Sequence, residues 1–148
     1  MTDEHFLGLA LALAREAGTA EEVPVGAVIV LNGELIGRGR NSPVSTHDPT
    51  AHAEILALRE AALQMRNYRL EGATIYTTLE PCVMCAGALV AARIKRLVFG
   101  ARDLRFGGVR SKFRLADSDL LNHKVEVVEG VLGAECSELL RDFFARRR

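Results

Sequence analysis

The chain has 148 residues, of which 49% are hydrophobic and 26% charged, and its formal net charge is zero. This composition excludes a disordered chain, and the length predicts a single domain over residues 1–148. No window holds the roughly 18 apolar residues of a membrane span, and Asp3 and Glu4 stand where a signal peptide would carry basic residues. We therefore expect a cytoplasmic protein.

The first half of the chain predicts a helix, a β-hairpin and a second helix. Apolar residues recur every three or four positions over residues 3–17, which is typical of an amphipathic helix. Two apolar runs, residues 24–31 and 34–39, flank Asn32-Gly33, the favoured sequence of a two-residue hairpin turn. Residues 41–50 contain prolines and hydroxyl side chains and predict a loop. A helix capped near Thr50 then runs to about Met65.

The second half predicts strands alternating with helices. The expected elements are strands over residues 73–78, 96–100 and 124–129, helices over residues 82–92 and 135–147, and a loop with a short helix around residues 115–121. Short connections between alternating elements favour parallel pairing with helices on both faces. The sequence thus predicts an α/β fold, a three-layer α/β/α sandwich around a five-stranded mixed sheet with an antiparallel hairpin at one edge.

Charge is unevenly distributed along the chain. Residues 93–114 hold eight basic residues and one acid, Asp103, and three arginines follow at 146–148, whereas acidic residues gather in the first quarter. A folded molecule could therefore present a basic face that binds a polyanion. A solvated surface of ordinary mixed charge is the alternative, and the sequence does not decide between the two.

Two of the three cysteines stand at an expected helix start, in Thr78-Leu79-Glu80-Pro81-Cys82-Val83-Met84-Cys85. Thiols at positions i and i+3 of a first helical turn point the same way and can reach one zinc ion at about 2.3 Å. Pro81 suits a helix entry, and the positive end of the helix dipole favours thiolates. A redox pair and two small core residues are alternative interpretations. Cys136 is expected to be a buried small residue of the last helix.

His52 is the expected third ligand, at the start of the second helix. Two helix starts that follow sheet elements can meet at one end of the sheet, where open α/β folds build their sites. Glu54 lies two positions later, about 200° around a helix, so it can lean over an open coordination position as a general base. Three protein ligands and an open fourth position are typical of catalytic zinc. Because two thiolates offset the charge of the zinc, a nearby carboxylate must take a proton from its water.

These residues resemble the pattern of the zinc-dependent nucleoside and nucleobase deaminases, His-x-Glu followed by Pro-Cys-x-x-Cys. Here the pattern reads His52-Ala53-Glu54 and Pro81-Cys82-Val83-Met84-Cys85. Within that superfamily the chain is similar to the bacterial tRNA adenosine deaminases, which make inosine at the anticodon wobble position. The similarity covers nearly the whole chain, in residues 22–28, 41, 47–54, 67–70, 79–87, 99–103, 122–123 and 142–144.

The resemblance implies a cytidine deaminase-like fold and one zinc ion per chain, held by His52, Cys82 and Cys85. It also implies hydrolytic deamination of adenosine to inosine at the wobble position of a tRNA anticodon. In that reaction a zinc-bound hydroxide would attack C6 of adenine, and Glu54 would carry protons to the ring nitrogen and to the departing ammonia. The implied partner is a tRNA anticodon stem-loop, with tRNA-Arg the expected species.

The resemblance further implies six substrate-binding residues, namely Val25, Asn41, Ala53, Arg102, Asp103 and Phe144. Asn41 would hydrogen-bond the purine, and the backbone N–H of Ala53 would donate to it. Asp103 and the basic residues beside it would contact flanking nucleotides. From the residues alone, Asn41 could equally be a turn residue after a strand, and Asp103 a cap in a solvated loop.

Two segments bear on assembly and specificity. The helix over residues 82–92 is apolar nearly all round, so its far side would meet a second copy of the chain, as in a homodimer, or neighbouring helices of the same chain. Residues 104–111 depart from the Lys-x-Gly-Ala-x-Gly-Ser pattern common in the bacterial tRNA enzymes. Phe106 and Arg110 add a stacking surface and a charge there, so the preferred RNA loop could differ.

Two other functions fit the metal motif. One is a free nucleobase or nucleoside deaminase that acts on guanine or cytosine, which has no use for the basic stretch. The other is a catalytically silent, zinc-containing RNA-binding subunit, which has no use for a carboxylate at Glu54.

Overall fold

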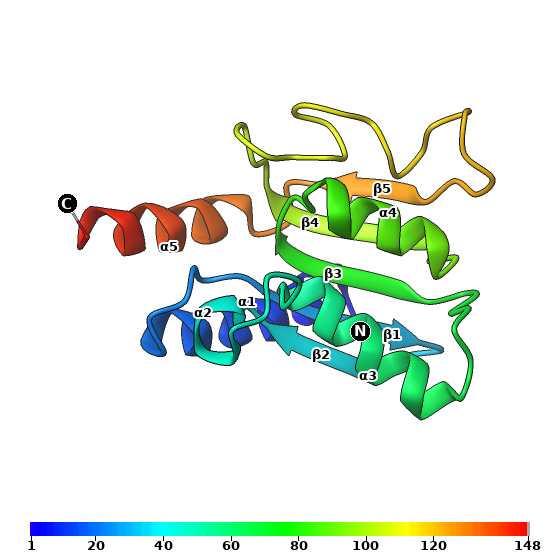
Figure 1. Cartoon of the computed structure of the whole chain (residues 1–148), viewed down its shortest axis with the longest axis horizontal. Coiled ribbons are helices and arrows are strands. Elements are labelled where there is room, and N and C mark those ends of the chain that lie inside the picture. Colours follow the sequence, from blue (N-terminus) through cyan, green and yellow to red (C-terminus); the bar gives the residue numbers. More distant parts are fainter. Residues whose placement is uncertain (148) are drawn as a thin grey trace.

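The computed structural model describes residues 1–147, and Arg148, the last of the three arginines, lies outside the described residues. The strands are β1 (Gly26–Leu31), β2 (Glu34–Arg40), β3 (Thr74–Leu79), β4 (Arg96–Ala101) and β5 (Glu126–Glu129). The helices are α1 (Asp3–Thr19), α2 (Pro43–Thr46), α3 (Ala53–Met65), α4 (Val83–Ala91) and α5 (Gly133–Ala145). The strands form one five-stranded sheet in the order β2-β1-β3-β4-β5 (Figure 1).

The sheet is mixed, as expected. β1 pairs antiparallel with both β2 and β3, whereas β3, β4 and β5 run parallel to one another. The hairpin between β1 and β2 turns at Asn32 and Gly33, whose φ angles of 51° and 80° are the positive values that a tight hairpin turn requires. α4 connects β3 to β4, and the sheet therefore has its antiparallel hairpin at one edge and parallel strands at the other.

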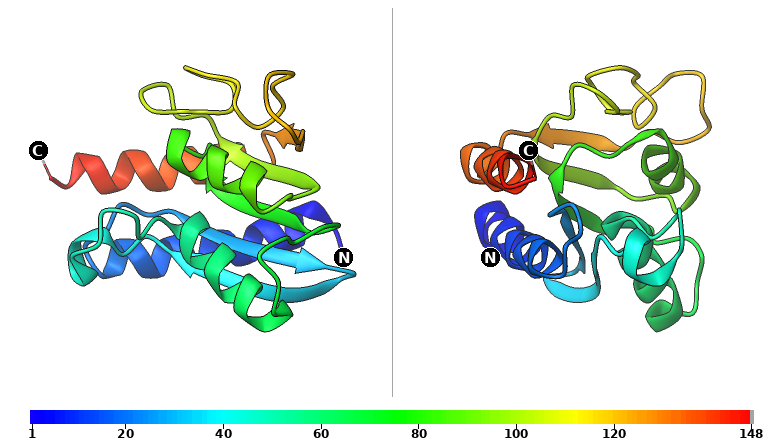
Figure 2. Two further views of the ribbon diagram at one scale, coloured as in Figure 1. Left: turned by 45° about the vertical axis from the view of Figure 1, so that its right-hand side comes forward. Right: turned by 60° about the vertical axis from the view of Figure 1, so that its left-hand side comes forward.

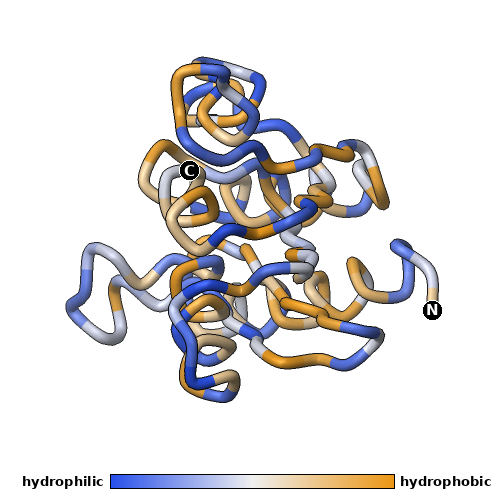
Figure 3. The backbone as a smooth tube through the Cα atoms, turned by 90° about the vertical axis from the view of Figure 1, so that its right-hand side faces the viewer, coloured by the Kyte–Doolittle hydropathy of each residue, from blue (hydrophilic) through white to orange (hydrophobic). Residues whose placement is uncertain are grey.

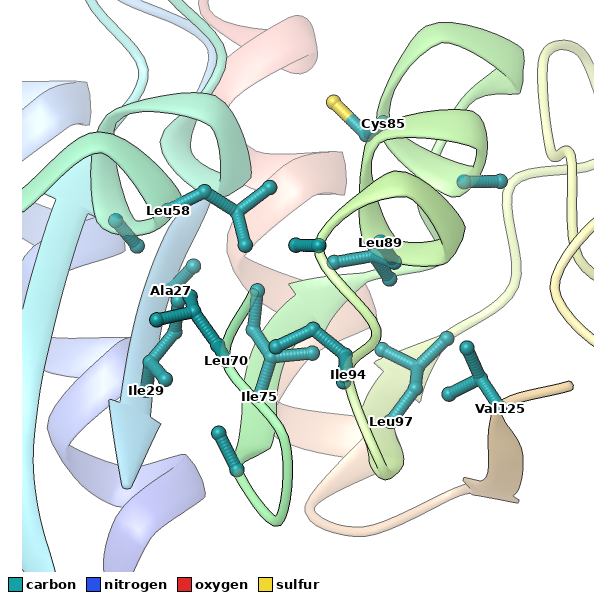
Figure 4. Packing of buried hydrophobic residues seen from close by; sticks show 14 of the residues in the cluster. Ala27, Ile29, Leu58, Leu70, Ile75, Cys85, Leu89, Ile94, Leu97 and Val125 are labelled. Atoms are coloured by element: carbon teal, nitrogen blue, oxygen red, sulfur yellow. The ribbon is translucent and has the colours of Figure 1, made fainter. Parts of the chain in front are cut away.

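Helices cover both faces of the sheet, so the predicted three-layer sandwich is confirmed. α3 and α4 lie on one face and α1 and α5 on the other, as the right-hand view of Figure 2 shows. Because side chains alternate across a strand, neighbouring residues of β1 enter different cores. Ile29 belongs to the core beneath α3 and α4, drawn in Figure 4, and Val30 to the core beneath α1. The hydrophobic and hydrophilic residues that alternate along the chain can be followed in Figure 3.

The structure differs from the sequence expectation in two connections. The loop predicted over residues 41–50 contains the short helix α2, and the helix predicted around residues 115–121 is absent, since those residues form turns and bends. Both differences have long-range causes. The carboxylate of Glu22 accepts the N–H groups of Val44 and Ser45 at the start of α2, at 3.2 and 2.7 Å. Asp117 is held by the guanidinium of Arg110 in a two-bond ion pair, a pairing that no local pattern shows.

The position of Cys136 in the last helix follows the expectation. Cys136 is 1% exposed and packs with Leu11 and Ala101 between α5, α1 and β4, as a buried small residue. Among residues 1–147, no helix combines the length and the apolar character that crossing a membrane requires.

Candidate metal centre

Two helix starts meet beyond the carboxyl end of β3. His52 directly precedes α3 and Cys82 directly precedes α4, and both have extended backbone angles. Cys85 follows in the first turn of α4 and is fully buried, with its sulfur at one end of the core in Figure 4. Because His52 stands before the helix and not in its first turn, the expected rotation of about 200° between His52 and Glu54 does not apply. The prediction that the three ligands converge is nevertheless confirmed.

The ligand atoms have the spacing of a zinc site. The Nδ1 atom of His52 lies 3.5 Å from the sulfur of Cys82 and 3.5 Å from the sulfur of Cys85. A tetrahedral zinc with bonds of about 2.3 Å to sulfur and about 2.0–2.1 Å to nitrogen would hold such atoms about 3.6 Å apart. The donor set of two sulfurs and one imidazole therefore fits zinc, and Nδ1 is the nitrogen that faces the ion.

The pKa values of these three side chains are strongly shifted. A hydrogen bond from Cys85, with a further contribution from His52, lowers the pKa of the Cys82 thiol to about 4. The same contact with Cys82, together with burial, raises the pKa of Cys85, and the Cys82 thiolate raises the pKa of His52. Cys82 is therefore a ready thiolate, and metal binding would displace the remaining protons.

Glu54 is a buried carboxyl at the start of α3. Its side chain is 4% exposed, and burial, aided by the negative charge of Cys82, raises its pKa to about 7. A buried carboxylate is costly unless it is paired, so such a group tends to take up a proton and become neutral. Its position beside the three ligands agrees with the place expected for a general base.

Three of the six expected substrate residues lie together next to the metal ligands. The backbone N–H of Asn41 donates to the carbonyl of Val25 at 3.0 Å, and the side-chain oxygen of Asn41 accepts the backbone N–H of Ala53 at 2.9 Å. In the structure the N–H of Ala53 donates to Asn41, and its expected contact with a purine stays a prediction. The amide NH₂ of Asn41 is left as the donor of this group.

The other three expected substrate residues lie further along the chain. Arg102 makes a two-bond ion pair with Glu129, at 2.7 and 3.1 Å. The carboxylate of Asp103 accepts the N–H groups of Arg105 and Phe106, both at 3.1 Å, and so caps a turn. Phe144 is 48% exposed on α5. The structure does not bring these three into contact with the metal ligands.

Glu80 is a buried residue that the sequence reasoning missed. It is 2% exposed and accepts five hydrogen bonds. The donors are the backbone N–H groups of Asp103, Val109, Arg110 and Ser111 and the hydroxyl of Ser111. Burial alone would raise the pKa of Glu80, but these hydrogen bonds outweigh it and lower the pKa. The signal in the sequence was a lone acid between a strand and Pro81.

This carboxylate fixes the segment of residues 103–111, the anchored loop, against the start of α4. The N–H of Gly108 donates to the carbonyl of Pro81 at 2.8 Å, and Gly107 forms an isolated antiparallel bridge with Cys82. A Cβ atom on Gly107 would lie 2.4 Å from the Glu80 carboxyl, and one on Gly108 would lie 2.9 Å from the backbone of Cys82. Only glycine permits such an approach, so the anchored loop is built onto the metal centre.

Half of the basic residues in the stretch form ion pairs within the part of the chain that the structure describes. Its members Arg96, Arg102, Arg110 and Arg114 all form ion pairs with carboxylates. Among residues 1–147 no such ion pair involves Lys95, Arg105 or Lys112, and all three are exposed. The described residues therefore carry a surface of mixed charge with a few unpaired cations, and binding of a polyanion there stays a prediction.

Comparison with known proteins identifies the family. A family model described as the cytidine and deoxycytidylate deaminase zinc-binding region matches residues 1–101. The chain belongs to this deaminase family. It is 51% identical over 147 residues to a tRNA-specific adenosine deaminase from Haemophilus influenzae, and the alignment covers 99% of this chain and 85% of the relative.

Solved structures agree with this membership. One comes from studies of A-to-I editing by tRNA:A34 deaminases at the wobble position of transfer RNA, with a TM-score of 0.89 and 46% identity over 92% of this chain and 99% of that chain. A guanine deaminase from Nitrosomonas europaea has a TM-score of 0.83 and 29% identity over 96% of this chain and 84% of that chain. The family is a zinc-binding one, and His52, Cys82 and Cys85 are positioned to hold one metal ion, which favours a metal site over a redox pair.

Proposed function

We propose that this protein hydrolyses adenosine to inosine at the wobble position of a tRNA anticodon. The observation that carries the proposal is a zinc-type ligand set beside a buried carboxyl, Glu54, in a chain 51% identical to a tRNA-specific adenosine deaminase. The identity extends over 99% of this chain, so it includes the segments around the site as well as the metal motif.

Glu54 would move the protons of the reaction. Zinc held by His52, Cys82 and Cys85 supplies a Lewis acid that acidifies water. Glu54 would accept a proton from that water and deliver it to the ring nitrogen of adenine, and a second transfer would let the C6 amino group leave as ammonia. Its burial at the start of α3, next to the ligands, keeps the carboxyl within reach of both reactants.

The Val25–Asn41–Ala53 cluster would hold the purine. Because Ala53 occupies the side-chain oxygen of Asn41, the amide of Asn41 has one orientation, and its NH₂ group would donate to a ring nitrogen acceptor. Val25 is 4% exposed and would pack beneath the base. Arg102, Asp103 and Phe144 would contact flanking nucleotides of the anticodon loop, for which we propose the loop of tRNA-Arg.

We also propose that the protein acts in the cytoplasm as a homodimer of single deaminase domains spanning residues 1–148. Support for the dimer comes from α4, where the exposed residues Val83, Gly87 and Ala91 form a small apolar stripe. In the described residues nothing lies within 4 Å of a Cβ atom built on Gly87, so this side of the helix is open. The mass of the zinc-loaded protein in solution, measured by sedimentation, tests this assembly.

The activity is tested on three substrates with two glutamate variants. The zinc-loaded protein is incubated with an anticodon stem-loop of tRNA-Arg bearing adenosine at the wobble position, with free guanine and with free cytosine. Inosine in the stem-loop is expected, and ammonia from guanine or cytosine is not. Glu54→Gln should retain zinc and fold but lose about 100-fold or more in rate, the usual contribution of general acid–base catalysis. Glu60→Gln, on the exposed side of α3, should match the wild type.

Other outcomes select the alternatives. Release of ammonia from guanine, without inosine in the stem-loop, would assign the protein the activity of a guanine deaminase. Zinc and RNA binding without any reaction, with Glu54→Gln unchanged, would make it a silent RNA-binding subunit.

A further inference from the structure

The anchored loop holds an aromatic ring out into solvent. Phe106 is 61% exposed, and Leu104 beside it is 72% exposed. The guanidinium of Arg105 lies over the Phe106 ring, 5.2 Å from its centroid. An exposed ring of this kind contributes little to the core of its own chain, and its free face is a surface for a partner.

The backbone that carries the ring lies close to the metal centre. The next residue, Gly107, pairs with the ligand Cys82 in an antiparallel bridge. Paired Cα atoms in such a bridge are about 4.5–5.5 Å apart, and consecutive Cα atoms about 3.8 Å apart. The Cα of Phe106 is therefore within about 9 Å of the Cα of Cys82, so the residue borders the metal centre.

The backbone that carries the ring is also held in place. The N–H groups of Arg105 and Phe106 both donate to the carboxylate of Asp103, and Glu80 binds both sides of the turn through Asp103 and Val109. A preorganised surface loses little conformational entropy when it binds. The backbone that carries Phe106 therefore does not need to fold on contact with a partner.

The charge around the ring selects the kind of partner. Within residues 1–147, Arg105 and Lys112 are exposed and form no ion pair with a carboxylate. An aromatic face backed by a guanidinium and flanked by free cations matches an unpaired base with its phosphates. A protein partner would gain nothing from these cations unless it were acidic.

We propose that Phe106, backed by Arg105, stacks on a base that flanks the target adenosine and so helps to determine which RNA loops are used. The inference rests on the proposed function, since it deepens the specificity of that site. It assigns a role to the part of the chain that departs from the pattern of the tRNA enzymes.

The test uses a stem-loop RNA with adenosine at the wobble position and 2-aminopurine at the adjacent position on either side. The variants are Phe106→Ala, Phe106→Leu and Phe106→Trp, with Leu120→Ala as a control, since Leu120 is 94% exposed in the same connection. Loss of one base–aromatic stack should raise KM by about 5-fold to about 100-fold in the Ala and Leu variants, with kcat changed far less. Binding should quench 2-aminopurine on one side in the wild type and Phe106→Trp, and not in the other two variants.

The outcomes separate this inference from the proposed function. If the wild type makes inosine but the Ala and Leu variants keep its KM and its quenching, the stacking role is overturned. An unchanged KM in Phe106→Leu together with a raised KM in Phe106→Ala would also overturn it, because an aliphatic contact would then suffice. Failure of the wild type to form inosine overturns the proposed function itself, and the stacking role falls with it. Zinc content and the midpoint of thermal unfolding confirm that each variant is folded.

Discussion

Replacing Glu80 by Gln should release the anchored loop from the metal centre. In the native protein one carboxylate oxygen accepts the N–H groups of Val109, Arg110 and Ser111, and the other accepts from Asp103 and the Ser111 hydroxyl. A glutamine can place its oxygen toward only one group of donors. With the oxygen on the three N–H groups, the hydroxyl can turn to accept from the new NH₂, but the N–H of Asp103 loses its acceptor.

The cost follows from these bonds. The orphaned N–H costs about 1 kcal/mol at a partly buried position, and each of the three remaining bonds weakens by about 1 kcal/mol when the acceptor loses its charge. The docking free energy of the anchored loop should therefore fall by about 4 kcal/mol. Because 1.4 kcal/mol is a factor of ten, about 4 kcal/mol should lower the protection of the Val109, Arg110 and Ser111 amides by about 700-fold.

Amide hydrogen exchange followed by NMR or mass spectrometry measures this loss directly. Glu60→Gln is the matched control, because Glu60 is exposed on α3 and its carboxylate pairs with Arg38 and not with the donors that bind Glu80. The rate of deamination by the Glu80→Gln variant should also fall, because the anchored loop pairs with Cys82. Native exchange rates at residues 109–111 in Glu80→Gln would refute the reasoning, because they would mean that the carboxylate does not hold the loop.

Removal of the metal by a chelator should lower the midpoint of thermal unfolding by about 10 °C, the effect of losing about 4 kcal/mol of ligand stabilisation in a chain of this size. Adding zinc should restore it in the wild type but not in Cys85→Ser, and full restoration in that variant would argue against Cys85 as a ligand. Acid should destabilise the protein, because hydrogen bonds from Arg96 and from Arg110 lower the pKa values of Asp3 and Asp117 and loop hydrogen bonds lower that of Glu80. These groups stabilise the fold above the ordinary carboxyl pKa of about 4, and the contribution is lost as the pH falls through their lowered values. Urea unfolding across this range should show that fall, with a shallower one in Glu80→Gln; equal stability at pH 3 and pH 7 would contradict the prediction.

The sequence predicted the sheet and the metal ligands because both depend on short patterns. Asn32-Gly33 marks the hairpin turn, and Pro81 followed by two cysteines marks a helix start with ligands. These are local signals, and the structure reproduces them within a few residues. Predicting His52 as the third ligand required one more step, namely the inference that two helix starts meet at one end of the sheet.

The missed features depend on contacts across the chain. Glu22 binds the start of α2 from 22 residues away, and Glu80 binds Val109 from 29 residues away. Neither contact leaves a periodic pattern in the sequence. A single sequence therefore offers no way to match one acid with the backbone of a distant loop. The same holds for the hydrogen bond from the N–H of Ala53 to Asn41, which joins residues 12 positions apart.

Two buried glutamates, Glu22 and Glu80, therefore hold segments that adjoin the metal centre. His52 follows a segment whose short helix is capped by Glu22, and Cys82 follows Glu80 by two residues. Each carboxylate ties a loop mainly by backbone N–H groups, which every residue type except proline provides. This arrangement lets residues 104–106 change in sequence without disturbing the ligands.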